Sequence, residues 1–145
     1  MKRIIAATLI ACGMARISAQ NQPQSGHHDQ HNSWSYEALS HVPDRDKARM
    51  NPLEHDPDAV QAGEKLFMRH CVECHGDNLG GTDRGINLMD EEVQEASPGA
   101  LFWILTNGVI RRGMPVWSKL PEPQRWQLVA YLKSAVGEPK KPPSQ

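Results

Sequence analysis

Apolar and polar positions alternate with a helical period in three stretches of the chain after residue 55. The first stretch places small or apolar residues on one side of a helix: Val60, Gly63, Phe67 and Cys71. Asp56 suits the position before such a helix, because its carboxylate can accept backbone N–H bonds, and Pro57 suits the first turn. The pattern therefore predicts a helix that starts near residue 57 and runs up to the first cysteine of a short motif.

The last stretch predicts a helix that packs against the first. It shows the i, i+3, i+4, i+7 spacing of a buried face: Leu128, Tyr131, Leu132 and Ala135. Pro121 and Pro123 mark its start, and Gly137 with Pro139 marks its end. Gly63 lies in the middle of the first helix, where glycine costs about 1 kcal/mol relative to alanine. We expect Gly63 to permit close approach of the last helix.

A third helix is expected between these two. Ser97 and Pro98 open it, and it should end at residues 107–108. Its apolar side consists of Leu101, Ile104 and Leu105. Residues 76–88 are glycine-rich and read as a loop. The sequence thus predicts an all-α domain over residues 56–137.

The ends of the chain are predicted to lie outside this domain. The chain has 145 residues, enough for one domain, and only 39% of them are hydrophobic. Residues 1–19 have the positive start, short apolar run and small residues of a secretory signal peptide, with a cut after Ala19. The apolar run is too short to span a bilayer. A competing cut before Cys12 resembles that of a bacterial lipoprotein and would anchor the chain to a membrane.

Residues 20–55 read as a polar, partly disordered N-terminal arm, and residues 138–145 as a flexible tail. The arm carries three histidines that either bind a metal ion weakly or belong to a solvated segment: His27, His28 and His31. Its later part carries apolar residues that would let it lie on the domain: Trp34, Tyr36, Leu39 and Val42.

Charge and cysteine content limit the partners. The formal net charge of the chain is −1, and loss of residues 1–19 removes three basic residues and no acidic one, which leaves −4. This charge argues against nucleic acid or an anionic membrane as the main partner. Cys71 and Cys74 are then the remaining cysteines, so no disulfide framework is available.

The motif Cys71-Val72-Glu73-Cys74-His75 is typical of an attachment site for a c-type haem. Each thiol can add to one vinyl group on the same edge of a porphyrin, and the adjoining imidazole can then reach the iron. A closed zinc site needs four protein ligands, yet no cysteine or histidine follows the motif, so zinc would have to take a ligand from the polar N-terminal stretch. A thioredoxin-like dithiol would need a strand where the sequence predicts a helix, and a disulfide across two residues would constrain little.

Over residues 57–137 the chain resembles the class I c-type cytochromes. The Gly63 and Phe67 pair stands at that family's offset before Cys71, and Leu128 with Tyr131 matches the pair on its last helix. The resemblance implies crossed first and last helices around one covalently bound haem c that is attached outside the cytoplasm. It also implies that a turn carbonyl accepts the ring N–H of His75, although this chain has Ile86 where a proline is common.

The resemblance further implies a second axial ligand. The family presents its distal methionine from a Gly-Met-Pro loop, which here is Gly113-Met114-Pro115. Two other methionines compete with Met114. Met68 should pack beside Phe67 on the first helix, and Met89 should lie on the proximal side of the haem.

Histidine and methionine ligands together leave no open iron position, so the sequence predicts a periplasmic one-electron carrier between donor and acceptor proteins of a respiratory chain, and not an enzyme. Two alternatives stay open. If Met114 does not bind, the iron has a vacant position, and the chain is a haem-based sensor or a minor peroxidase. If Cys12 is lipidated, the chain is an anchored cytochrome c subunit of a dehydrogenase or oxidase.

Several other residues are expected around the haem. Apolar side chains should bury it: Phe67, Leu88, Leu101, Trp103, Leu105 and Val116. Four residues either face the propionates or form a solvated rim: Arg84, Arg111, Arg112 and Trp117. Arg111 and Arg112, with Lys119, should place positive charge beside the exposed haem edge. An acidic cluster is expected elsewhere, so that the resulting dipole steers the edge toward an acidic partner: Asp90, Glu91, Glu92 and Glu95.

Overall fold

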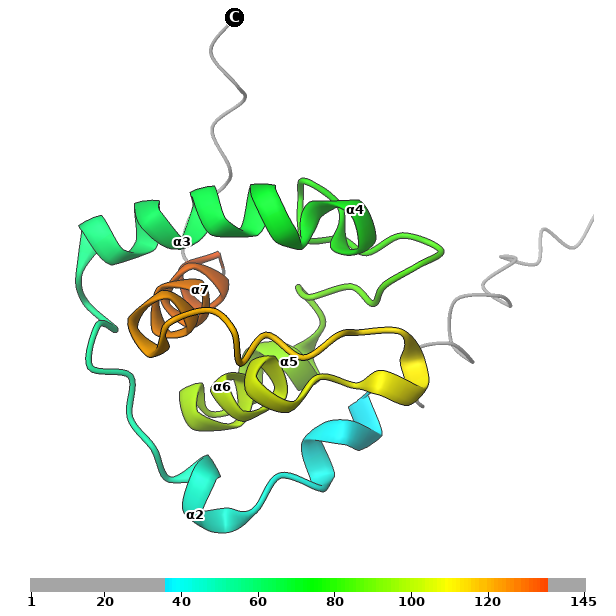
Figure 1. The fold of residues 1–145 in the computed structure, drawn as a ribbon, viewed down its shortest axis with the longest axis horizontal. Helices are drawn as coiled ribbons and strands as arrows, with labels where there is room; N and C mark the ends of the chain where they lie inside the picture. The colour runs from blue at the N-terminus through cyan, green and yellow to red at the C-terminus, as the bar shows by residue number, and fades with distance from the viewer. Residues whose placement is uncertain (1–35, 136–145) are drawn as a thin grey trace, which may run out of the picture.

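The computed structural model describes residues 36–135, in which helices are joined by loops and no strand is present (Figure 1). Residues 36–40 are helical, and the elements that follow are α2 (Asp44–Lys47), α3 (Pro57–His70), α4 (Val72–His75), α5 (Glu91–Glu95), α6 (Pro98–Asn107), the 3-10 helix η1 (Ile110–Arg112) and α7 (Glu122–Ser134). The all-α prediction is confirmed. The predicted signal peptide, Cys12, the three arm histidines, Trp34 and the C-terminal tail lie outside the described residues.

The predicted starts of α3 and α6 and the predicted end of α6 agree with the structure, whereas Gly137 and Pro139, predicted to end the last helix, lie outside the described residues. The side chain of Asp56 accepts the backbone N–H groups of Asp58 and Ala59 at 2.9 and 3.3 Å, which caps α3. Ser97 caps α6 through the N–H of Ala100 at 3.2 Å, and Gly108 ends it with a φ of 68°. These positions were predictable because each depends on a local side chain or on a backbone conformation that glycine favours.

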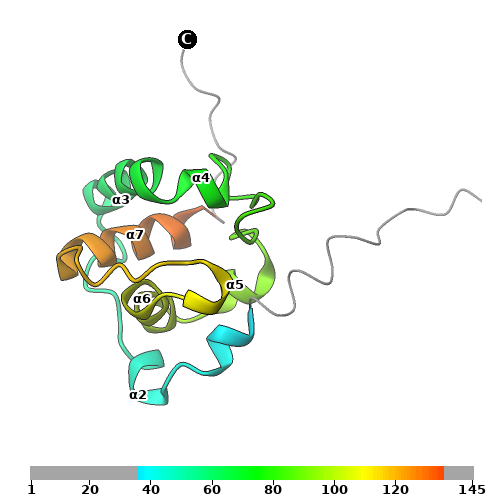
Figure 2. The same ribbon diagram turned by 45° about the vertical axis from the view of Figure 1, so that its right-hand side comes forward.

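Helices α3 and α7 cross in close contact, as Figure 1 and Figure 2 show from two directions. A methyl group on Gly63 would lie 2.0 Å from the carbonyl oxygen of Gln127 and 2.8 Å from Cβ of Tyr131, so no larger residue fits there without a shift. Beside the crossing, the rings of Phe67 and Tyr131 lie 5.5 Å apart between centroids. The prediction that Gly63 allows the last helix to approach is confirmed.

The buried face of α7 is wider than the predicted stripe. Leu128, Tyr131 and Leu132 are buried as expected, but Trp126, Val129 and Ala130 are buried as well. The reason is that α7 is covered on a second side by α6 and by the segment before α3. A helix covered on two sides has no polar face at these positions, so a single stripe underestimates its burial.

The segment 42–51 packs on α6 and α7. Val42 and Asn51 are buried, and the amide of Asn51 donates to the carbonyl of Trp126 at 3.1 Å. The guanidinium of Arg49 lies 4.4 Å from the ring centroid of Phe102, which itself stacks on Trp126 at 4.0 Å. Residues that the sequence assigned to a polar arm therefore contribute to the core.

None of the helices within residues 36–135 is long and apolar enough to cross a membrane.

Replacement Gly63→Ala should lower the free energy of unfolding by roughly 1–3 kcal/mol, the usual cost of overpacking a tight core, despite the higher helix propensity of alanine. Guanidinium denaturation followed by circular dichroism measures the loss. Lys65→Ala on the exposed side of α3 is the matched control and should change stability by less than about 0.5 kcal/mol. Equal stability of Gly63→Ala and the control would contradict the close crossing.

Candidate functional site

The two thiols and the imidazole of the motif lie on one short turn at the end of α3. Cys71 ends α3, and its carbonyl accepts the N–H groups of Cys74 and His75 at 3.1 and 3.0 Å. Both thiols are free and half-buried. Burial, with a smaller contribution from Cys74, raises the pKa of the Cys71 thiol to about 11.

The imidazole of His75 is oriented by a backbone carbonyl. Its Nδ1 lies 3.0 Å from the carbonyl oxygen of Ile86. A carbonyl oxygen only accepts, so Nδ1 carries the hydrogen and Nε2 keeps its lone pair. Burial lowers the pKa of His75, and the bond to Ile86 opposes this in part. The expected carbonyl contact to His75 is confirmed, with isoleucine in the place of the usual proline.

The loop of residues 76–88 folds back over the motif. The N–H of Gly81 donates to the carbonyl of His75 at 2.9 Å, and the hydroxyl of Thr82 donates to the carbonyl of Cys74 at 2.7 Å. A methyl group on Gly85 would lie 2.6 Å from that same Cys74 oxygen. The sequence predicted a glycine-rich loop but not the contacts of Thr82 and Gly85. No local pattern signals them, since they form only when the chain reverses.

Met114 lies on a separate loop that is held to the end of α6. Val109 and Met114 form an isolated antiparallel bridge, with N–H to carbonyl distances of 3.0 and 3.3 Å. Further along the loop, the N–H of Trp117 donates to the carbonyl of Leu105 at 2.9 Å. The Met114 side chain is half-buried and packs against the core. The thioether is therefore carried by a loop anchored at two points.

The two competing methionines are more exposed. Met68 is 45% exposed, so the expectation that it packs beside Phe67 is wrong. Phe67 itself points into the core, and the next residue on a helix is turned by about 100°, which directs Met68 to solvent. Met89 is 38% exposed and lines an open hollow with Glu91 and Lys133 near the end of α7.

The residues expected around a haem divide into three groups. Phe67, Leu101 and Leu105 are buried; Leu88 and Trp103 are half-buried; Val116 is 45% exposed.

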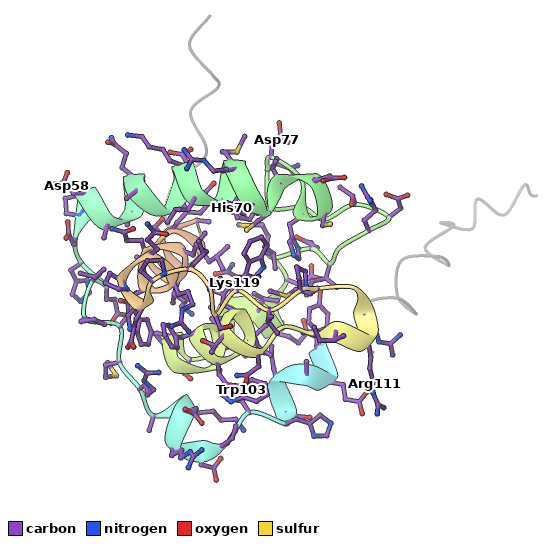
Figure 3. The ribbon with its side chains drawn as sticks, viewed as in Figure 1. Asp58, His70, Asp77, Trp103, Arg111 and Lys119 are labelled. Atoms are coloured by element: carbon purple, nitrogen blue, oxygen red, sulfur yellow. The ribbon has the colours of Figure 1, made fainter. Side chains whose placement is uncertain are left out.

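Two of the charged residues named from the sequence have partners near the site, and one of them, Asp90, departs from the expectation. Arg84 forms an ion pair with Glu73 within the motif. Asp90 is half-buried and accepts hydrogen bonds from Tyr36 and Asn87, so it does not belong to an exposed acidic surface with its neighbours on α5. Arg111 lies in the middle of η1 and points away from the body of the molecule (Figure 3).

The aromatic ring of Trp117 contacts the motif's side of α3. Its centroid lies 5.3 Å from that of His70, the residue just before Cys71. His70 is labelled on the inner side of α3 in Figure 3. The contact joins the loop that carries Met114 to the helix that leads into the motif.

The donor set of this site suits a haem of the c type. Two neighbouring thiols on one turn can form two thioether bonds, and a neutral imidazole with a free Nε2 lone pair can ligate iron. A thioether on another loop is a suitable second ligand. Within residues 36–135, no three side chains of histidine, cysteine, aspartate or glutamate cluster in a way that could hold a metal ion by themselves.

Known proteins resemble this chain over the same region. The family model described as "Cytochrome C oxidase, cbb3-type, subunit III" matches residues 58–132. The cbb3-type cytochrome c oxidase subunit CcoP of Rubrivivax gelatinosus is 29% identical over 89 residues, which are 60% of this chain and 29% of that protein. The chain thus spans less than a third of this curated relative.

A solved structure has a similar fold. The crystal structure of cytochrome CL from the marine methylotrophic bacterium Methylophaga aminisulfidivorans MPT has 27% sequence identity and a TM-score of 0.53, and the match covers 68% of this chain and 67% of that one.

Two glycines of the Met114 loop differ in what a side chain would meet. Both Gly108 and Gly113 have positive φ, but a methyl group on Gly108 would lie 2.7 Å from the backbone of Pro115, whereas one on Gly113 would meet nothing within 4 Å. Gly113→Ala should therefore cost only the left-handed strain of about 1–2 kcal/mol. Gly108→Ala should cost a further 1–3 kcal/mol or so for the collision. Chemical denaturation measures both, and a Gly113→Ala loss as large as that of Gly108→Ala would contradict this account.

Proposed function

This chain belongs to the cytochrome c family of the cbb3-type oxidase subunit III, and from that premise we propose that it is a periplasmic one-electron carrier with a single covalently bound haem c. The family supports electron transfer with haem c. In our proposal, Cys71 and Cys74 form the thioether bonds, and His75 and Met114 are the axial ligands.

The contact between His75 and Ile86 carries this proposal. A proximal histidine must be neutral, must present one ring nitrogen to the iron, and must be held in a fixed orientation by a bond from the other. The 3.0 Å contact from Nδ1 to the Ile86 carbonyl supports the second and third requirements, and burial, which lowers the pKa of His75, supports the first. The haem supplies reversible one-electron chemistry at its iron when bound. The protein side chains orient it and exclude water.

Whether Met114 binds the iron would decide between an electron carrier and a haem-based sensor or minor peroxidase. With sulfur and imidazole both bound, no position remains for oxygen or peroxide, and a thioether favours ferrous iron. The half-buried position of Met114, compared with the more exposed Met68 and Met89, supports its assignment. A haem-based sensor or minor peroxidase would instead need this position vacant.

Export and partners follow from the sequence features. Residues 1–19 read as a signal peptide. We propose that the mature chain passes electrons between a donor and an acceptor protein, with no role for nucleic acid, and contacts a membrane only if Cys12 carries lipid.

Replacement Met114→Ala should abolish the low-spin spectrum of the oxidised haem protein and lower its reduction potential, because the thioether that favours ferrous iron is lost. Visible spectroscopy and potentiometric titration measure the two effects. Met68→Ala and Met89→Ala are matched controls and should leave both unchanged. A Met114→Ala protein with the wild-type spectrum and potential would refute the assignment, and a high-spin wild-type protein would favour the sensor or peroxidase.

A second candidate function is that of a cytochrome c subunit in a terminal oxidase complex. It is supported by the family description and by the similarity to the oxidase subunit CcoP. It differs from the first in its location and assembly, since a subunit stays with the oxidase and a carrier does not.

Intact mass and fractionation of the protein from its native cells distinguish the two. A carrier cut after Ala19 should be recovered from the periplasmic fraction with the mass of residues 20–145 plus one haem. Lipid on Cys12, or recovery with an oxidase in the membrane fraction, would support the subunit and overturn the carrier.

A further inference from the structure

The turn of residues 86–88 is held by side chains from three different elements. The carbonyl of Ile86 accepts from His75 of α4, and the carbonyl of Leu88 accepts from the side-chain amide of Gln94 of α5 at 2.5 Å. The carbonyl of Asn87, between them, lies 3.4 Å from the hydroxyl of Tyr36. Three consecutive carbonyl groups thus each face a side-chain donor.

The hydroxyl of Tyr36 is bonded mainly to Asp90. It has one hydrogen to donate, and the carboxylate of Asp90 is the nearer and charged acceptor. The same carboxylate accepts from the side-chain amide of Asn87, whose own oxygen accepts the N–H of Met89 at 2.9 Å. Burial and the bond to Asp90 raise the pKa of Tyr36, so the hydroxyl keeps its hydrogen.

This connection crosses a long stretch of the chain. Tyr36 stands 54 residues before Asp90, on a helix that lies outside the family match over residues 58–132. Leu39 of the same helix packs against the core, and Val42 after it is buried. The packing of Leu39 and Val42 on the core therefore holds the Tyr36 ring in place, and its hydroxyl can fix the turn that it contacts.

We propose that Tyr36 is a positioning residue for His75: through Asp90 and Asn87 it fixes the turn that presents the Ile86 carbonyl to Nδ1. This proposal rests on the proposed function, in which His75 is the proximal ligand. A firm bond to Nδ1 makes the imidazole a better donor to iron and stabilises the ferric state. A loosened turn weakens that bond, so its loss should raise the reduction potential.

The test uses the full-length haem protein with Tyr36→Phe, which keeps the ring and removes the hydroxyl. The potential should shift upward, and the Nδ1 hydrogen of His75 should exchange about three- to tenfold faster in the ferrous protein, the factor expected for the loss of one hydrogen bond. Potentiometric titration and proton NMR measure these effects.

Tyr131→Phe is the matched control. Tyr131 is buried, and its hydroxyl has no hydrogen-bond partner among residues 36–135, so its loss should change neither potential nor exchange. In an Asp90→Ala background, Tyr36→Phe should add little further change in exchange, because the connection is already broken.

The outcomes separate the two proposals. A wild-type protein without haem, or without histidine ligation in its NMR spectrum, would refute the proposed function itself. A normal wild-type spectrum with Tyr36→Phe unchanged in potential and exchange, even if less stable, would show that Tyr36 is only structural and overturn this inference. Additive effects of Tyr36→Phe and Asp90→Ala would overturn it as well.

Discussion

The contact of α3 with α7 at Gly63 is the constraint on which the rest of the structure depends. Because Gly63 lacks a side chain, the backbone of α7 approaches until a methyl group would stand 2.0 Å from a carbonyl oxygen. This distance fixes where α3 lies, and α3 leads without a break into Cys71. The motif is thus positioned by helix packing two turns away, before any loop contributes. Phe67, one turn after Gly63, continues the same contact against Tyr131.

The features that the sequence predicted depend on interactions between neighbouring residues. The features that it did not predict depend on contacts between residues far apart in the chain. Asp56, Ser97 and Gly108 act on their own helix ends, so their roles follow from residue type and position. The orientation of Met68 was predicted wrongly because its neighbour Phe67 takes the core position. The Tyr36 contact with Asp90 joins residues 54 apart, and no periodic pattern encodes such a pair. Helices and the motif were thus accessible from sequence, whereas the supporting contacts of the site depend on the tertiary fold.

The segment before α3 extends the core beyond the region that matches the family. Arg49 lies over the stacked rings of Phe102 and Trp126, and its guanidinium also pairs with Glu122 at 2.7 Å. Its long aliphatic stem and planar cation cover aromatic surface that would otherwise face water. A small domain buries a limited fraction of its surface, so an added layer of this kind matters to its stability. The helix of residues 36–40, just before this segment, places Tyr36 at the turn beside His75.

The two sides of the proposed haem site are built with unequal rigidity. On the side of His75, the loop of residues 76–88 is bonded to the motif through Gly81, Thr82 and the Ile86 carbonyl, and then to α5. On the side of Met114, the loop is held by the bridge to Val109, by the bond from Trp117 to Leu105 and by the ring contact of Trp117 with His70. Fewer bonds mean a lower cost of local opening, so the methionine loop is the part expected to open first. The proposed electron carrier would tolerate this asymmetry, because the histidine side would keep the iron in place while the sulfur would set its preference for the ferrous state.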